Sequence, residues 1–197
     1  MKFFGRDMNK LKYKDLTEKQ IRKYMEKYAD DKEFWGVISS HQDLSENFIR
    51  EFQDHLDWGN ISTCQELSEN FIFEFKDKLN WENISRFKFL REEFIDRVED
   101  KIHWNYLTTY RKFSEQFIEK HIEHFEWEHI FEYQTVSEDF MKKHKKEYWN
   151  SGPCLNKIRM YQKISHSFNM EILRQQQKML DVFVKMKYYK NKTKKRS

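Results

Sequence analysis

Apolar positions recur along the chain with a long and regular period. An isoleucine or leucine follows each of the first five tryptophans after three residues, an apolar residue after nine and a phenylalanine after thirteen. The six tryptophans are separated by 23, 23, 23, 23 and 22 residues: Trp35, Trp58, Trp81, Trp104, Trp127 and Trp149. Such self-similarity at a fixed spacing predicts a tandem repeat.

Polar positions repeat with the same period. Ten residues after the tryptophan stands a serine in four of the five units, and a glutamate follows that position in all five. The consensus unit reads W-x-x-I-S-x-x-Q-x-L-S-E-x-F-I. Because the glutamate recurs in every unit, we interpret it as a residue of a helix start and not as a general acid.

The spacing within one unit predicts two helices. Phe48, Ile49, Phe52 and Leu56 fall on one stripe of a 3.6-residue period, and Ser45 precedes them as a helix N-cap. This predicts a helix of about three turns over residues 45–56. Asp57 caps a second, shorter helix from residue 58 to about residue 65. Strand-like alternation is absent, so each unit is expected to contain a long and a short helix.

A single unit of this size has no core of its own and must bury its apolar side chains against its neighbours. We therefore predict an all-α fold, an α-solenoid of about five 23-residue two-helix repeats with degenerate capping units. After Trp149 the Ser-Gly-Pro sequence at 151–153 predicts a chain break, and Leu155 takes the tryptophan position of a degenerate unit. A last helix is expected from about Ser167 to Tyr188.

These patterns divide the chain into four segments. Residues 1–34 form an N-terminal capping unit and residues 35–150 form the repeat array. Residues 151–188 form the degenerate repeat and the C-terminal helix, and residues 189–197 form a basic tail. The N-terminus lacks the apolar core of a signal peptide, no stretch is long enough to span a membrane, and two unpatterned cysteines suggest no disulfide framework. An intracellular protein is expected.

The consensus unit resembles tandem repeats found in proteins of large double-stranded DNA viruses and bacteriophages. The resemblance covers roughly residues 35–149, and Lys88, Arg91 and Phe131 depart from the consensus. It implies a viral or phage origin, and hence a location in the host cytoplasm or the virion. It implies no activity, because these repeat proteins share no common function.

Charge is distributed unevenly along the chain. Residues 43–139 hold 23 acidic and 11 basic side chains, whereas residues 140–197 hold 3 acidic and 16 basic ones. The acidic part is a solvated surface, a docking surface for a basic partner, or a crude mimic of nucleic acid. Opposite charges at the two parts also allow self-association, within one copy or between copies.

The basic C-terminal end has its own alternatives. Its lysines and arginine could neutralise phosphates while Tyr188 and Tyr189 stack on bases, or they form an ordinary solubilising tail. Membrane-surface binding is not expected, because the preceding helix shows no clean apolar face with tryptophan anchors. The candidate nucleic-acid-binding residues are Lys185, Lys187, Lys190, Lys192, Lys194, Lys195 and Arg196.

Catalytic and metal-binding signals are weak. His121, His124 and His129 lie among glutamates, but His121 stands in a column that three other units fill with apolar residues and one fills with His144. A partly buried histidine with a polar partner is therefore preferred over a metal ligand. No nucleophile motif and no glycine-rich phosphate loop is present, so we predict a protein that is not an enzyme and that holds no cofactor.

Aromatic residues in otherwise charged columns are candidates for protein binding. Phe73 and Phe89 occupy such columns, which suggests that both are exposed, and Phe87, Tyr110 and Tyr133 form a further aromatic column. Local repacking is the alternative explanation. We select Phe73, Phe89, Tyr110 and Tyr133 as candidate protein-binding residues. The predicted function is a binding scaffold, either a virion assembly component or a host-factor binder, with nucleic-acid association as the alternative.

Overall fold

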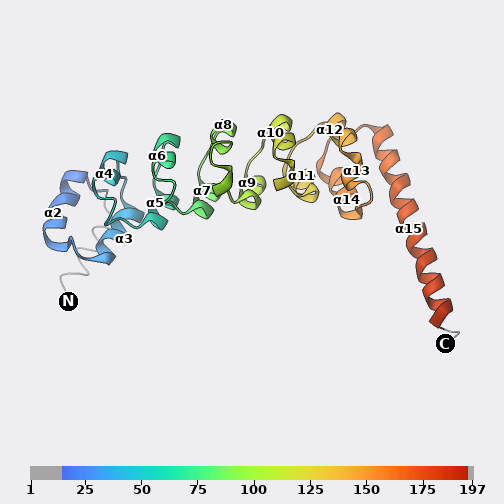
Figure 1. Cartoon of the computed structure of the whole chain (residues 1–197), viewed down its shortest axis with the longest axis horizontal. Helices are drawn as coiled ribbons and strands as arrows, with labels where there is room; N and C mark the ends of the chain where they lie inside the picture. Colours follow the sequence, from blue (N-terminus) through green and yellow to red (C-terminus); the bar gives the residue numbers. More distant parts are fainter. Residues whose placement is uncertain (1–14, 195–197) are drawn as a thin grey trace. The chain divides into compact units, whose positions relative to one another are not determined.

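A computed structural model describes the backbone of residues 15–194 and the side chains of residues 15–187 (Figure 1). Every regular element in these residues is a helix, which confirms the predicted all-α repeat fold. The chain groups into two compact units, one ending at Tyr106 and one beginning at Leu107, and each is described separately. The division falls within the fourth repeat.

The first unit contains a row of helices that each begin near a tryptophan and a second row that begins at the conserved glutamates. Its helices are α2 (Glu18–Tyr28), α3 (Lys32–His41), α4 (Glu46–Glu51), α5 (Trp58–Cys64), α6 (Glu69–Glu74), α7 (Trp81–Phe87), α8 (Glu92–Ile95) and the 3-10 helix η1 (Glu99–Lys101). Helix α5 packs between α3 and α7, while α4, α6 and α8 form the second row (Figure 1). One isoleucine from each row of each repeat is fully buried between them, so the core is shared between neighbouring repeats.

The second unit repeats this arrangement and ends in a long helix. Helix α9 (Trp104–Tyr110) spans the division between the units. The elements that follow are α10 (Glu115–Lys120), the 3-10 helix η2 (Ile122–His124), α11 (Trp127–Tyr133), α12 (Glu138–Lys143), α13 (Lys145–Tyr148), α14 (Gly152–Tyr161) and α15 (His166–Lys194). Helix α14 packs against α11, and the beginning of α15 packs against α14 (Figure 1).

Helix starts follow the predicted caps, but helix ends do not. The hydroxyl of Ser45 accepts the N–H of Phe48 at 3.2 Å, and a carboxylate oxygen of Asp57 accepts the N–H of Asn60 at 2.9 Å. The predicted helix over residues 45–56 is too long, because α4 ends at Glu51. The carbonyl of Phe52 then accepts the N–H groups of both His55 and Leu56. The apolar residues Phe52 and Leu56 therefore lie in a tight turn and not in the helix.

The C-terminal part also differs from expectation. The Ser-Gly-Pro sequence at 151–153 is not a break but the start of α14, where Ser151 is the N-cap and Pro153 occupies the first turn. A proline there loses no helical hydrogen bond, because the first N–H groups of a helix have no intrahelical partner. The last helix starts at His166, one residue early, and continues to Lys194 instead of ending at Tyr188.

A buried glutamine joins several repeats to the preceding one, whereas Lys88 and Arg111 occupy the equivalent position in two others. Nε2 of Gln65 donates to the backbone carbonyls of Ser39 and Gln42 at 2.9 and 2.8 Å, and its Oε1 accepts the N–H of Leu44 at 3.0 Å. We call this set of three hydrogen bonds a rung, and the two carbonyls and one N–H that receive the side chain its socket. A rung satisfies three backbone groups that would otherwise lack a partner in the core.

The rung recurs in the second unit with the same geometry. Gln134 donates to the carbonyls of Thr108 and Arg111 and accepts from the N–H of Phe113. Gln162 donates to the carbonyls of Phe131 and Gln134 at 2.7 and 2.8 Å and accepts from the N–H of Val136 at 3.2 Å. The glutamines that stand seven residues after the tryptophan position therefore connect neighbouring repeats.

The invariant glutamate connects repeats as well. A carboxylate oxygen of Glu46 accepts the N–H of Ser68 at 2.8 Å, and Glu138 accepts the N–H of Ser165 at 2.8 Å. In each pair the acceptor lies one repeat before the donor. The glutamate thus stands at a helix start, as predicted, and also fixes the backbone of the following repeat.

Candidate protein-docking surface

The two aromatic candidates in the first unit differ in exposure. Phe89 is 84% exposed, as predicted, and Phe87 on the end of α7 is 50% exposed. Phe73 is half-buried rather than exposed. Its ring lies 4.3 Å from Cζ of Arg97 and 4.9 Å from Nζ of Lys76, and these cation–π contacts cover it. Phe89 and Phe87 therefore offer more accessible apolar surface than Phe73.

The tyrosine candidates belong to the second unit. Tyr110 is 59% exposed, whereas Tyr133 is half-buried with its ring 5.6 Å from that of His129. Tyr161 on α14 is also about half-exposed and stands six residues after Leu155, as Tyr110 and Tyr133 follow their tryptophans. Tyr161 was not among the predicted residues, although its position in the repeat identifies it.

A larger apolar surface lies on α15. Phe168 and Ile172 are buried at the start of this helix, and Phe168 stacks on Trp149 with 6.1 Å between ring centroids. The same side of the helix continues beyond them at spacings of three and four residues. We call this continuation the α15 stripe: Met179, Val182, Phe183 and Met186.

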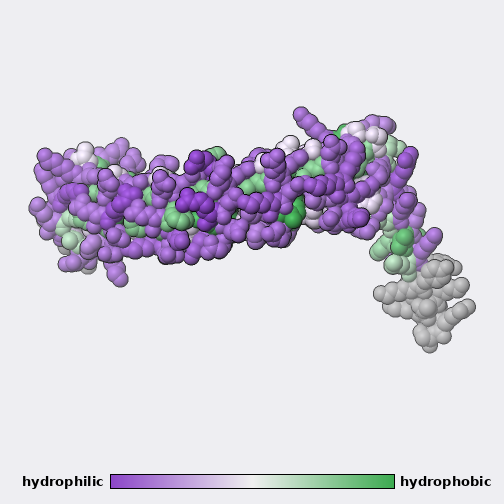
Figure 2. All heavy atoms as spheres, turned by 45° about the horizontal axis from the view of Figure 1, so that its top comes forward, coloured by the Kyte–Doolittle hydropathy of each residue, from purple (hydrophilic) through white to green (hydrophobic). Residues whose placement is uncertain are grey.

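Three of the four residues of the α15 stripe are exposed although they prolong a buried face, and Met179 is half-buried. Val182, Phe183 and Met186 are 50, 62 and 65% exposed. With Gln175, Lys178 and Asn150 they line an open pocket of about 460 Å³. Figure 2 shows apolar side chains along this part of α15 beside the residues drawn in grey. A contiguous exposed patch of large apolar side chains is typical of an interaction site.

Polar contacts hold the first part of α15 in place. Nε2 of Gln175 donates to Asn150 at 3.0 Å, and Nε2 of Gln176 donates to Asn156 at 2.8 Å. Arg159 donates to Oε1 of Gln176 at 3.2 Å. In the described side chains after Gln176, no hydrogen bond joins α15 to the repeats. Hydrogen bonds to the repeats therefore hold only the first part of α15, and the exposed residues from Val182 onward follow it.

The sequence analysis did not recognise this stripe. It expected no clean apolar face in the last helix, but Met179, Val182, Phe183 and Met186 follow the i, i+3, i+4, i+7 spacing of one helix face. That spacing was visible in the sequence. The sequence does not show where α15 separates from the repeats. The burial of Phe168 and Ile172 depends on tertiary packing, which local spacing does not reveal.

The basic candidates fall partly on this helix. Lys185 and Lys187 are exposed next to the α15 stripe, as is Lys178. Lys190, Lys192 and Lys194 lie in the helical backbone, but their side chains are outside the described residues, and Lys195 and Arg196 lie outside altogether. Among residues 15–194, no helix is long and apolar enough to cross a membrane.

The histidine cluster forms no metal site in the described part of the chain. His121 is buried with its ring 4.6 Å from that of Phe117, and His124 is exposed. Nδ1 of His129 is buried without a hydrogen-bond partner. The described residues contain no group of three histidine, cysteine, aspartate or glutamate side chains arranged to hold an ion.

Comparison with known proteins adds no relative to this picture. No protein-family model, no curated protein and no solved structure matches the chain. The repeat geometry and the exposed surface of α15 are therefore the basis for assigning a function.

Proposed function

We propose that this protein is a non-enzymatic helical-repeat scaffold that docks a protein partner on the α15 stripe. The observation that carries the proposal is the continuity of one helix face. Its first part, with Phe168 and Ile172, is buried in the repeats, and its last part, with Val182, Phe183 and Met186, has the same apolar character but is at least half-exposed. The repeats fix the base of α15, and the stripe presents the binding side chains.

The exposed side chains supply a sufficient driving force. Complete burial of one large apolar side chain contributes about 1.5–3 kcal/mol relative to full exposure. Phe183 and Met186 still expose about two thirds of their surface, so docking would recover more than half of that amount for each. Methionine adds adaptability, because its flexible thioether fills irregular gaps in a partner surface.

The side chains on and beside the α15 stripe indicate the chemistry of the partner. Side chains spaced three and four residues apart on an exposed helix pack against another helix or in an apolar groove. Lys178, Lys185 and Lys187 flank the stripe and are exposed. An acidic amphipathic helix therefore complements both the apolar stripe and its basic border. The resemblance of the repeats to viral and phage proteins suggests an assembly component or a host factor as the source of that helix.

The aromatic surfaces are secondary candidates for the same role. Phe89 in the first unit and Tyr110 in the second are the most exposed of the selected residues. Phe73 and Tyr133 expose less of their rings. Because aromatic anchors often carry much of the interface energy, Phe89→Ala is a useful companion variant in any binding assay.

The test compares two substitutions on opposite sides of α15. The full chain, a Phe183→Asp variant and a Val184→Asp variant would capture proteins from the native host after nuclease treatment, with quantitative mass spectrometry of the captured proteins. Val184 is 57% exposed but points away from the stripe, so it is the matched control. We expect one acidic protein to be lost with Phe183→Asp and retained with Val184→Asp. Equal capture by all three proteins would contradict the proposal.

Nucleic-acid binding is the second candidate, supported by the exposure of Lys185 and Lys187 at the end of the described side chains. Contacts to phosphate release counterions, so such binding weakens steeply with salt. A double Lys185→Gln and Lys187→Gln variant should then bind random DNA or RNA more weakly, whereas Phe183→Asp should not change this binding. Salt-dependent self-association without nucleic-acid binding would instead support pairing of the oppositely charged parts of the chain.

A further inference from the structure

The last repeat contains a socket without a rung. Leu155 takes the tryptophan position in this repeat, so Arg159, Gln162 and Ile164 correspond to the residues that form each preceding socket. In three of the repeats before it, those backbone groups receive a glutamine side chain from the next repeat. No further repeat follows here, because the chain continues directly into the long helix α15.

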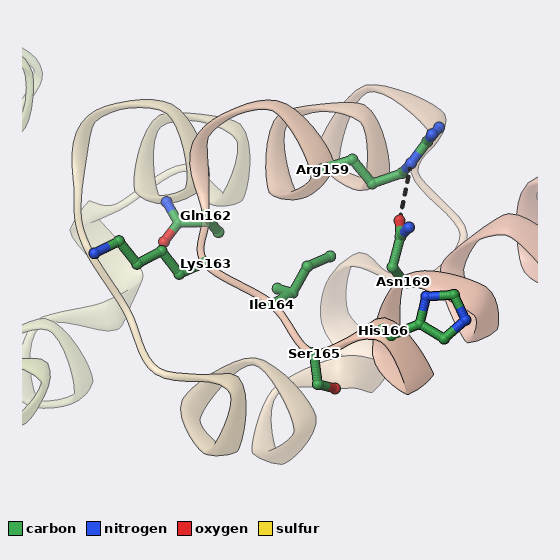
Figure 3. Close-up of a pocket in the computed structure, with 7 residues that line it drawn as sticks. All are labelled: Arg159, Gln162, Lys163, Ile164, Ser165, His166 and Asn169. Carbon is green, nitrogen blue, oxygen red and sulfur yellow. Dashed lines mark hydrogen bonds between the residues drawn. The ribbon is translucent and has the colours of Figure 1, made fainter.

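The socket is an open pocket of about 720 Å³. Its lining residues are Arg159, Gln162, Lys163, Ile164, Ser165, His166 and Asn169 (Figure 3). Among the residues that the structure describes, the carbonyl of Gln162 and the N–H of Ile164 have no hydrogen-bond partner. In Figure 3, the Ile164 side chain lies between Gln162 and Asn169. The equivalent Val136, covered by the following repeat, is buried, whereas Ile164 is only half-buried.

We propose that this end socket binds the primary carboxamide of a glutamine side chain on another polypeptide. The filled sockets of the same chain define the ligand chemistry. In each rung an amide NH₂ donates to two carbonyls while the amide oxygen accepts one backbone N–H. The end socket presents these same backbone groups, two acceptors and one donor, and a carboxamide matches them all.

The charge around the socket selects an amide over an ammonium group. Lys88 shows that a lysine also fills a socket, because its Nζ donates to the carbonyls of Thr63 and Gln65. That socket carries Glu66 on its rim, whereas the equivalent position of the end socket is Lys163. Arg159 and His166 add to the basic rim. A neutral glutamine with acidic neighbours fits this rim better than a lysine.

The repeats themselves suggest the sequence context of the ligand. In the second repeat, the glutamine of the rung lies in the sequence Gln-Glu-Leu-Ser-Glu, residues 65–69, which is rich in acidic residues. A folded second copy of this chain is not the source: Gln42, Gln65, Gln134 and Gln162 are all buried, and the exposed Gln116 is followed by Ile118, which is itself fully buried. The occupant is therefore an acidic segment of a different protein, with a glutamine two residues before an aliphatic side chain. This site uses residues other than the α15 stripe, so each proposal can fail without the other.

The test uses amide chemical shifts of the full chain. The probe is a blocked synthetic peptide with the sequence of residues 65–70, Gln-Glu-Leu-Ser-Glu-Asn, titrated into ¹⁵N-labelled protein. We expect the Ile164 amide signal to shift with saturation, while the Val136 amide, already bonded to Gln162, does not move. A peptide with leucine in place of the glutamine should bind about tenfold more weakly.

A substitution at the rim of the end socket tests whether basic charge there contributes to binding of the acidic peptide. Lys163 is exposed, so Lys163→Glu should leave the fold and the Val136 signal unchanged and should weaken binding of the acidic peptide about tenfold or less. An Ile164 signal that does not respond would overturn the proposal, as would equal binding of the glutamine and leucine peptides. An unchanged affinity of Lys163→Glu would overturn the requirement for an acidic ligand.

Discussion

Replacing the rung glutamine Gln65 with leucine tests the physical basis of the repeat stack. Leucine has a similar size but no polar atoms, so Gln65→Leu keeps the packing volume and removes the whole rung. Three backbone groups then lose their partner: the carbonyls of Ser39 and Gln42 and the N–H of Leu44. Gln65 is 4% exposed, so water does not replace these bonds without a local opening of the structure.

The expected cost follows from these three groups. A buried donor or acceptor without a partner costs about 1–3 kcal/mol. Neighbouring residues relax and admit some water, so we expect a loss at the lower end of the sum, about 3–5 kcal/mol of unfolding free energy. Such a loss is a large fraction of the stability of an ordinary domain.

Urea denaturation followed by far-UV circular dichroism measures this loss. The matched control is Gln116→Leu, because Gln116 is exposed and takes part in no rung. That control should change the unfolding free energy by about 0.5 kcal/mol or less. A Gln65→Leu protein as stable as the control would refute the reasoning, since it would mean that the rung bonds contribute nothing beyond packing.

Further substitutions test the other parts of the fold. Lys88→Gln restores a rung and should stabilise the protein by about 1 kcal/mol. Burial lowers the pKa of Lys88, so the parent's stability should rise with pH toward the ordinary lysine pKa, and the variant should lose this rise. The pKa of Glu138 is lowered to about 2, first by its hydrogen bond with Lys142, so its contribution should be lost as pH falls from 4.5 toward 2 and be absent in Glu138→Gln. Melting temperatures across pH measure both effects. Trp81→Ala should cost about 3–5 kcal/mol in denaturant titrations, because Trp81 is buried. His121→Phe should melt at or above the parent temperature, since three of the four other repeats place an apolar residue at that position.

Local chemistry made the helix starts predictable. Ser45 and Asp57 cap their helices through bonds to residues three positions away, so neighbouring sequence is sufficient to identify them. The end of α4 was not predictable in this way. The apolar stripe continues through Leu56 with helical spacing, although the chain turns after Glu51 to begin the next helix. The role of Gln65 was hidden too, because its partners lie in the preceding repeat.

The exposure of a candidate residue was predictable only where the residues at the equivalent positions of the other repeats indicate it. Phe89 replaces charged residues in its column and is exposed. Phe73 does the same but is covered by Arg97, which comes from the next repeat and cannot be assigned to that ring from spacing alone. The α15 stripe and the end socket depend on where the repeats stop, which is a property of tertiary packing.

Amide hydrogen exchange tests the central claim, that glutamine rungs join successive repeats and that the last socket is open. The N–H groups of Leu44, Phe113 and Val136 each donate to a rung glutamine, whereas the N–H of Ile164 has no partner among the described residues. We expect the three rung amides to exchange slowly, only upon opening of the repeat stack, and the Ile164 amide to exchange at nearly the rate of an unprotected amide. Fast exchange at the rung amides, or protection of Ile164 equal to that of Val136, would contradict the claim.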